Sequence, residues 1–232
     1  MTTTEVNSIL KRLQSLGNPK SVEGMARFGI TTRKAFGVSA PDLRRMAKEI
    51  GKNHDLAQEL WSVDVLETRA LAFLIDEPSE VTEKQLEQWV REFDNWAVCD
   101  GCCANLFDKT VFARKKGVEW SRRKREFEKR AAFTLMAALA VHDKKAADKE
   151  FLSFLPIIKR EADDERNFVK KAVNWALRQI GKRNLALNKM AIQTAKEIQR
   201  LDSKSARWIA ADALRELTSA AVQRKLLRKR KP

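Results

Sequence analysis

The sequence predicts an all-α protein, a superhelical solenoid of HEAT-like antiparallel helix pairs with a concave basic groove. Three observations support this fold class. The 232 residues include only 8 Gly and 5 Pro, which leaves few helix breakers. Apolar residues recur at helical spacing along almost the whole chain. Similar Ala-rich helices return along the chain, as they do in repeat proteins.

Helical periodicity and short polar connections define the expected elements. The predicted helices cover residues 4–16, 20–35, 41–50, 54–62, 64–76, 82–93, 95–108, 110–121, 124–141, 148–162, 165–181, 187–200, 203–217 and 219–228. No linker separates two domains, so we expect one HEAT-like-repeat domain over 1–223 and a basic C-terminal tail over 224–232.

Four of these helices share a basic residue followed by an Ala-rich apolar run. They begin at Arg69, Arg130, Lys171 and Arg207, which are 61, 41 and 36 residues apart. Alanines let neighbouring helices approach closely, so the pattern favours stacked helix pairs of the HEAT or armadillo kind. An ordinary helical bundle is the competing architecture.

Composition limits the compartment and the class of protein. The N-terminus lacks a basic region followed by an apolar one, so it does not resemble a secretion signal. The most apolar run, 131–141, is too short to cross a bilayer. Three closely spaced cysteines do not suit a disulfide framework. We therefore expect a cytoplasmic protein with no membrane contact and no cofactor.

The positive charge is concentrated near the C-terminus. Residues 166–232 hold 18 Lys and Arg against 4 Asp and Glu, whereas residues 1–165 are almost balanced. Basic side chains that neutralise phosphates release counterions and gain affinity without reading sequence. The asymmetry therefore favours a nucleic-acid partner, although a solvated face or a tail that binds an acidic surface would look similar.

The stretch DNWAVCDGCCANLFD (94–108) contains all three cysteines. Cys99, Cys102 and Cys103 lie at i, i+3 and i+4 with no second pair, and both histidines are distant in the sequence. A zinc site needs four ligands, whereas one helical face of small apolar residues is typical of a core. We expect buried core residues and no metal; a reactive thiol is the lesser alternative.

A second pair in this stretch lies on a different part of the helix surface. Trp96 and Asp100 are four residues apart, so they project about 40° from each other. A carboxylate and an indole thus point in similar directions. The structural alternative is a tryptophan packed in a groove and an aspartate in an ion pair.

At this point the chain resembles the AlkD-type DNA alkylation repair proteins, which are HEAT-like-repeat DNA glycosylases. The resemblance covers nearly the whole chain. It includes Asn18-Pro19, Met25–Phe28, Phe36–Arg44 and the Ser203–Trp208 helix start. Its most specific parts are Trp96-x-x-x-Asp100, the helix start at Arg130 and the segment Lys170–Arg178.

The resemblance implies catalytic roles for Asp100, Trp96 and Trp175, and a phosphate contact for Arg130. It implies excision of positively charged N3- or N7-alkylpurines, such as 3-methyladenine and 7-methylguanine, without base flipping. The expected partner is double-stranded DNA containing alkylated bases, bound by a monomer. The further residues expected to follow the duplex are Lys170, Lys171, Arg178, Lys182, Arg183, Lys204 and Arg207.

One position departs from the family pattern. Phe28 aligns with a position that often carries Tyr, and this chain has no tyrosine. Some relatives bind branched or distorted DNA without excising bases. Two alternatives to a glycosylase therefore stay open, a non-catalytic protein that binds DNA structures and a HEAT-type protein scaffold.

Overall fold

The computed structural model describes residues 3–30 and 34–228, and within these ranges every regular element is a helix. The chain divides into two compact units, Met1–Val111 (unit 1) and Phe112–Pro232 (unit 2). No helix in the described ranges is long and apolar enough to span a membrane.

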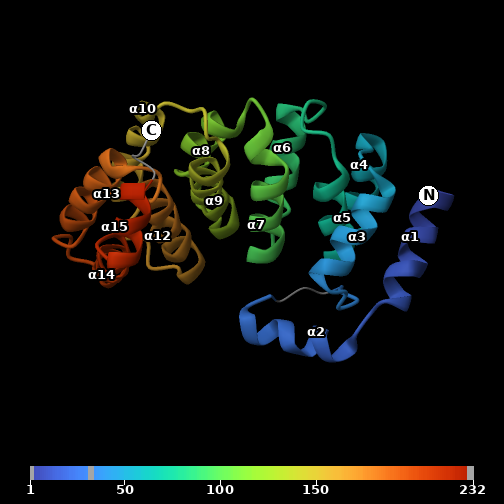
Figure 1. Ribbon diagram of the computed structural model, residues 1–232. Helices are drawn as coiled ribbons and strands as arrows, with labels where there is room; N and C mark the ends of the chain where they lie inside the picture. Colours follow the sequence, from blue (N-terminus) through green and yellow to red (C-terminus); the bar gives the residue numbers. More distant parts are fainter. Residues whose placement is uncertain (1–2, 31–33, 229–232) are drawn as a thin grey trace. The chain divides into compact units, whose positions relative to one another are not determined.

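Unit 1 consists of seven α-helices and two short 3-10 helices among its described residues (Figure 1). They are α1 (Thr4–Ser15), α2 (Pro19–Met25), η1 (Ala26–Phe28), α3 (Ala40–Ile50), α4 (His54–Ser62), α5 (Leu66–Ile75), α6 (Glu83–Arg91), α7 (Trp96–Asn105) and η2 (Phe107–Lys109). The helix α5 packs against α3, α4 and α7.

Unit 2 is also helical throughout its described part. Its elements are α8 (Ala113–Trp120), α9 (Glu126–His142), α10 (Asp148–Leu152), α11 (Leu155–Arg160), α12 (Asn167–Gly181), α13 (Leu185–Ile198), α14 (Lys204–Leu217) and α15 (Ala220–Arg228). The helix α9 packs against α8 and α12, and α13 packs against α14. Consecutive helices joined by short connections form antiparallel pairs, as predicted.

Small residues let the helices of unit 2 approach one another. All residues from Ala131 to Ala140 are buried, because α9 is covered by neighbouring helices. At the end of α12, a Cβ added to Gly181 would lie 2.7 Å from a methyl carbon of Leu217. The Ala-rich runs therefore have the packing role that the repeat pattern predicts.

The structure corrects two predicted helices. The helix expected over 20–35 ends by Phe28, because Gly29 adopts a left-handed conformation with φ 73°. The helix expected over 148–162 is divided into α10 and α11. Pro156 has no N–H to donate to the preceding turn, so it lies in the first turn of the new helix α11, which begins at Leu155, instead of continuing α10.

The predicted C-terminal tail falls partly on structured residues. Arg224 and Lys225 belong to α15, which continues to Arg228. Residues 229–232 lie outside the described part of the chain. The division into one repeat domain and a tail stays a prediction, as does the concave groove.

Candidate active site and nucleic-acid interface

The helix α7 is anchored by the face that carries the cysteines. Its N-cap is the buried Asn95, whose side-chain oxygen accepts a 3.0 Å hydrogen bond from the Val98 N–H. Cys99, Cys102 and Cys103 are completely buried, which confirms the core interpretation. Burial and the neighbouring thiols raise the pKa of Cys102 and of Cys103 well above the usual range.

A glycine lets α7 pack closely on α5. A Cβ added to Gly101 would lie 2.4 Å from Cζ of Phe73, a side chain that is 6% exposed. Gly101 directly follows Asp100 in the sequence. The close contact therefore sets how near α7 lies to α5 at the turn that carries the Asp100 carboxylate.

Trp96 and Asp100 lie on successive turns of α7, and both are half-buried. The indole nitrogen of Trp96 donates a 2.8 Å hydrogen bond to the backbone oxygen of Phe28. Phe28, whose backbone accepts this bond, is 72% exposed. The structure thus brings Trp96 into contact with Phe28, and the family resemblance had singled out both positions.

The buried carboxylate of Glu67 accepts hydrogen bonds from residues 36–38, a segment that contacts the start of α2. Glu67 accepts hydrogen bonds from the N–H groups of Phe36, Gly37 and Val38 at 3.0, 2.7 and 3.2 Å. The Phe36 oxygen in turn accepts a 2.8 Å bond from the N–H of Asn18, the N-cap of α2. This chain of contacts connects α5 to the helical segment that ends at Phe28.

In unit 2, Arg130 has an internal partner. Its guanidinium donates a 2.6 Å hydrogen bond to the Phe168 backbone oxygen and lies 6.0 Å from the ring centroid of Phe168. The residue is 7% exposed. Its phosphate contact stays a prediction, and the observed bond connects α9 to the first turn of α12. Trp175 lies on α12 and is half-buried.

Three of the predicted DNA-binding cations contact α14, and their contacts with DNA stay a prediction. Lys170 lies 5.3 Å from the ring centroid of Trp208, Arg178 donates a 2.5 Å bond to Glu216, and Lys182 donates a 2.6 Å bond to the same carboxylate. Burial raises the pKa of Glu216, but the bond from Lys182 and the charge of Arg178 outweigh it, and the pKa is lowered overall. These contacts form a ladder between α12 and α14.

Arg183 also makes internal contacts. It donates hydrogen bonds to the backbone oxygens of Ala140 (2.9 Å), Asp143 (2.9 Å) and Ala146 (3.3 Å). Its guanidinium lies 3.9 Å from the ring centroid of Phe151. Arg183 therefore satisfies carbonyls at the end of α9, a role that the sequence did not reveal.

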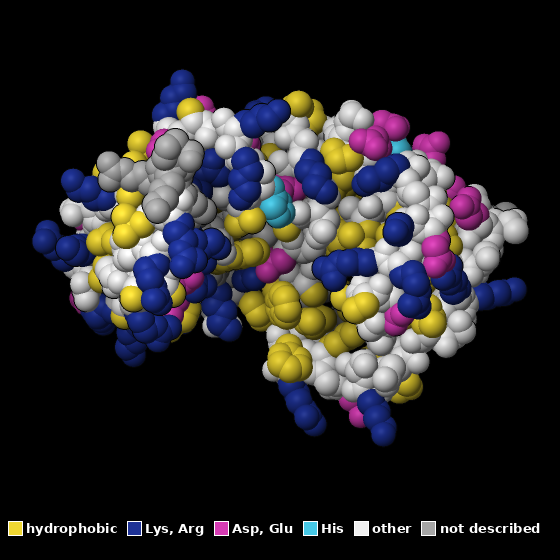
Figure 2. Space-filling view, viewed as in Figure 1, with side chains coloured by type: hydrophobic (Ala, Val, Ile, Leu, Met, Phe, Trp, Pro, Cys, Tyr) yellow, Lys and Arg dark blue, Asp and Glu magenta, His cyan; other side chains and the backbone are white. Residues whose placement is uncertain are grey.

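The remaining candidates are exposed. Lys171, Lys204 and Arg207 all point to the surface of unit 2, and Arg207 has an ion pair with Asp202 at 3.2 Å. Figure 2 shows Lys and Arg side chains gathered over the part of unit 2 where α13 to α15 lie. Trp208, which is 41% exposed, is an aromatic surface residue that sequence reasoning did not select.

The candidate catalytic residues and the candidate phosphate contact Arg130 are divided between the two units. Trp96 and Asp100 are neighbours in unit 1, whereas Arg130 and Trp175 lie in unit 2. A site that uses all four residues stays a prediction.

The fold has a known counterpart. The chain is similar to a solved structure described as "a new family of proteins related to the HEAT-like repeat DNA glycosylases with affinity for branched DNA structures". The TM-score is 0.75 with 18% identity, over 91% of this chain and 94% of that one. The likeness confirms the predicted class, an all-α fold of the HEAT-like-repeat kind.

Comparison of the sequence with family models identifies the family. A family model described as "DNA alkylation repair enzyme" matches residues 9–217, so the chain belongs to the DNA alkylation repair enzyme family. It is also similar to the uncharacterized protein Lin0241 of Listeria innocua serovar 6a, with 24% identity over 190 residues. That alignment covers 80% of this chain and 83% of the relative.

Proposed function

We propose that this protein is a DNA glycosylase that excises positively charged N3- and N7-alkylpurines from double-stranded DNA. The observation that carries the proposal is the pair on α7, in which a half-buried indole and a half-buried carboxylate lie one helical turn apart. Membership of the DNA alkylation repair enzyme family supports the same chemistry.

The reaction requires little acid catalysis. An N3- or N7-alkylpurine is already a cation and leaves as a neutral base when the electron pair of the C1′–N bond passes to it. Water then forms the C1′–O bond and loses a proton. Asp100 is the group proposed to stabilise the positive sugar and to orient this water, an electrostatic contribution of about 3 kcal/mol.

The tryptophans are proposed to select the charged lesion. Indole faces attract cations, with each contact contributing about 0.5–2 kcal/mol depending on desolvation. The bond from Trp96 to the Phe28 oxygen restricts the orientation of one of these rings. Trp175 is the proposed second indole. Neutral bases gain nothing from this attraction, so the site would discriminate without a pocket for a flipped base.

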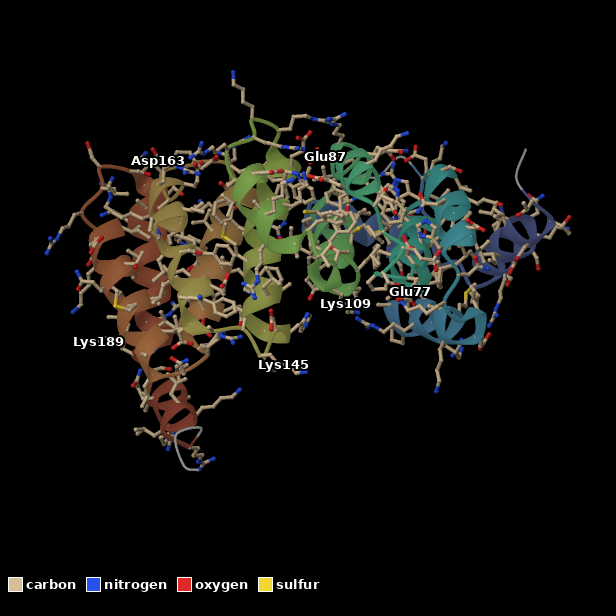
Figure 3. All side chains as sticks on the ribbon, turned by 90° about the horizontal axis from the view of Figure 1, so that it is seen from above. Glu77, Glu87, Lys109, Lys145, Asp163 and Lys189 are labelled. Carbon is tan, nitrogen blue, oxygen red and sulfur yellow. The ribbon has the colours of Figure 1, made fainter. Side chains whose placement is uncertain are left out.

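The direct test is release of 3-methyladenine and 7-methylguanine from methylated duplex DNA. Asp100→Asn keeps the shape of the side chain but removes its charge, so the excision rate is expected to fall at least ~100-fold while DNA binding persists. Asp163→Asn makes the same charge change at an exposed position in unit 2 (Figure 3) and should retain the rate. No release by the unaltered protein, with binding intact, would refute the proposal.

The second candidate function is non-catalytic binding of branched DNA. The structurally similar protein is described as having affinity for branched DNA structures, which favours this reading. It is supported if the protein binds a four-way junction more tightly than a linear duplex of equal length and releases no alkylated base. Equal affinity for the two DNAs argues against it.

A further inference from the structure

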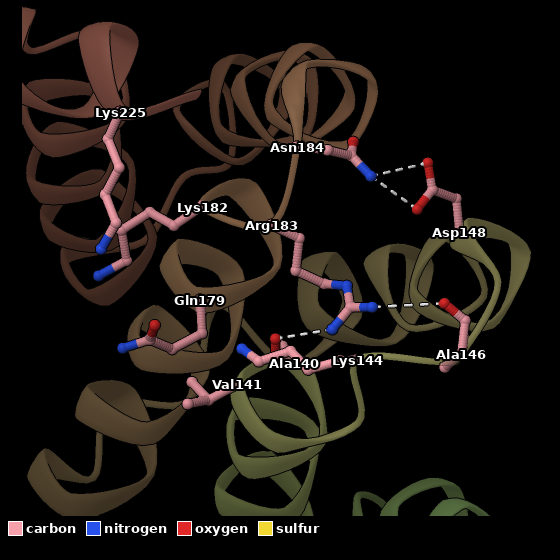
Figure 4. Close-up of a pocket in the computed structure, with 10 residues that line it drawn as sticks. All are labelled: Ala140, Val141, Lys144, Ala146, Asp148, Gln179, Lys182, Arg183, Asn184 and Lys225. Carbon is pink, nitrogen blue, oxygen red and sulfur yellow. Dashed lines mark hydrogen bonds between the residues drawn. The ribbon is translucent and has the colours of Figure 1, made fainter. Parts of the chain in front are cut away.

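A basic pocket in unit 2 is separate from the residues proposed for catalysis. Its volume is about 600 Å³, and it lies among the last turn of α9, the connection that leads to the first residue of α10, the C-terminal end of α12, the connection between α12 and α13, and α15 (Figure 4). Among the described residues, the cations that line it are Lys144, Lys182, Arg183 and Lys225, and Asp148 is the single carboxylate.

Three of the charged lining groups, Asp148, Arg183 and Lys182, already have strong partners. Both carboxylate oxygens of Asp148 accept hydrogen bonds from the Asn184 amide, at 2.8 and 3.0 Å. The guanidinium of Arg183 is directed to backbone oxygens, as Figure 4 shows for Ala140 and Ala146. These groups form a preorganised wall, because their orientations are fixed by the fold.

Lys144 and Lys225 differ from these partnered groups, whereas Lys182 does not. Lys182 shares the Glu216 carboxylate with Arg178. Lys144 and Lys225 are exposed, and neither ammonium group forms an ion pair or hydrogen bond with the described residues. Figure 4 shows the side chains of Lys182 and Lys225 extending on the same side of the pocket. Several like charges around one hollow repel one another, and an anion bound between them relieves that repulsion.

The pocket also has an apolar side, against which an organic group attached to the anion could pack. Ala140 and Val141 add apolar surface next to the lysines. A bare inorganic ion would not use this surface, whereas a sugar or a nucleoside attached to a phosphate would. The volume is sufficient for a phosphate with such a group, since small-molecule sites begin at about 300 Å³.

We propose that this pocket is a phosphate-binding site, in which Lys144, Lys182 and Lys225 hold a phosphate carried by a nucleic-acid strand or by a small phosphorylated molecule. The nucleic-acid source rests on the DNA binding of the proposed function but not on base excision. Unmodified DNA and inorganic pyrophosphate therefore test it independently of any glycosylase activity.

The experiment compares two double variants of the full chain with equal charge changes. The pocket variant is Lys144→Ala with Lys225→Ala. The control is Lys145→Ala with Arg224→Ala, which removes the adjacent exposed cations outside the pocket lining. Figure 3 shows Lys145 at the edge of unit 2. All four side chains are exposed, so both variants should melt at the temperature of the unaltered protein.

The first measurement is affinity for an unmodified 20-base-pair duplex over a series of salt concentrations. Loss of two phosphate contacts should weaken binding by about 10- to 60-fold at 0.1 M salt and lower the slope of log K against log salt by about 2. The control should change affinity by less than about threefold. The second measurement is binding of inorganic pyrophosphate by calorimetry.

The outcomes identify the source of the phosphate. A selective loss of DNA affinity in the pocket variant assigns the site to a nucleic-acid strand. A selective loss of pyrophosphate binding with unchanged DNA affinity assigns it to a small phosphorylated molecule. If the pocket and control variants behave alike in both measurements, the lysines contribute only to the general positive field and the proposal is wrong.

Discussion

The indole N–H of Trp96 donates a hydrogen bond to the Phe28 backbone oxygen, across 68 residues of sequence. The bond joins the first residue of α7 to the end of η1, so the candidate tryptophan is oriented by a segment that is remote in the chain. Phe28 itself is 72% exposed.

Phe28→Tyr tests whether this ring contacts DNA. The ring is 72% exposed, so an added hydroxyl can be solvated and the melting temperature should not change. One additional hydrogen bond to DNA contributes about 0.5–1 kcal/mol, which corresponds to a two- to fivefold gain in affinity measured by fluorescence anisotropy. Unchanged affinity for both methylated and unmodified duplexes would show that position 28 does not touch the DNA.

Gly101→Ala tests the close packing of α7 on α5. The added methyl group would overlap the Phe73 ring, so the free energy of unfolding should fall by about 1–3 kcal/mol despite the better helix propensity of alanine. Gly24→Ala is the matched control, because nothing lies within 4 Å of its added Cβ and it also lies within a helix. Urea unfolding should show Gly24→Ala to be neutral or stabilising; equal destabilisation of both variants would contradict the packing argument.

Arg183→Lys separates an internal role from a DNA contact. Lysine keeps the charge but lacks the planar guanidinium that binds three carbonyls. The free energy of unfolding should therefore fall by about 2 kcal/mol. DNA affinity should change less than twofold. The opposite pattern, unchanged stability with weakened DNA binding, would assign Arg183 to the interface.

The ladder between α12 and α14 predicts a pH-dependent stability. The pKa of Glu216 is lowered in the folded protein, so the unfolded chain binds the proton more readily. The stabilisation is therefore present above the ordinary glutamate pKa of 4.5 and is lost as the pH falls through the lower folded value. Glu216→Gln should lower the free energy of unfolding by about 1–2 kcal/mol at pH 7.

Urea unfolding of the unaltered protein and of Glu216→Gln, measured from pH 7 to pH 3, tests the ionic contribution of this ladder. The difference in stability between the unaltered protein and Glu216→Gln should shrink as the pH falls. Glu80→Gln is a suitable control, since Glu80 is exposed and lies in unit 1, outside the ladder. A constant difference for Glu216→Gln across this range would argue against an ionic contribution.

The sequence by itself determined the helical class, most helix boundaries and the burial of the three cysteines. These properties are local, because periodicity, capping residues and breakers act within one or two turns. The two wrong helices arose where Gly29 and Pro156 interrupt a pattern that is otherwise helical. The resemblance to the DNA alkylation repair proteins was also readable, since its motifs lie in short segments.

Only the tertiary structure decided which charged and aromatic side chains are available at the surface. Trp61, Trp89 and Trp120 are buried in the core, whereas Trp96 and Trp175 are half-buried. Lys171, near the start of α12, is exposed, but Arg183, just beyond the end of α12, binds backbone oxygens. The physical reason is that several of these side chains find their partners far away in the sequence: Trp96 bonds to Phe28 across 68 residues, Arg183 to Ala140 across 43 and Arg178 to Glu216 across 38.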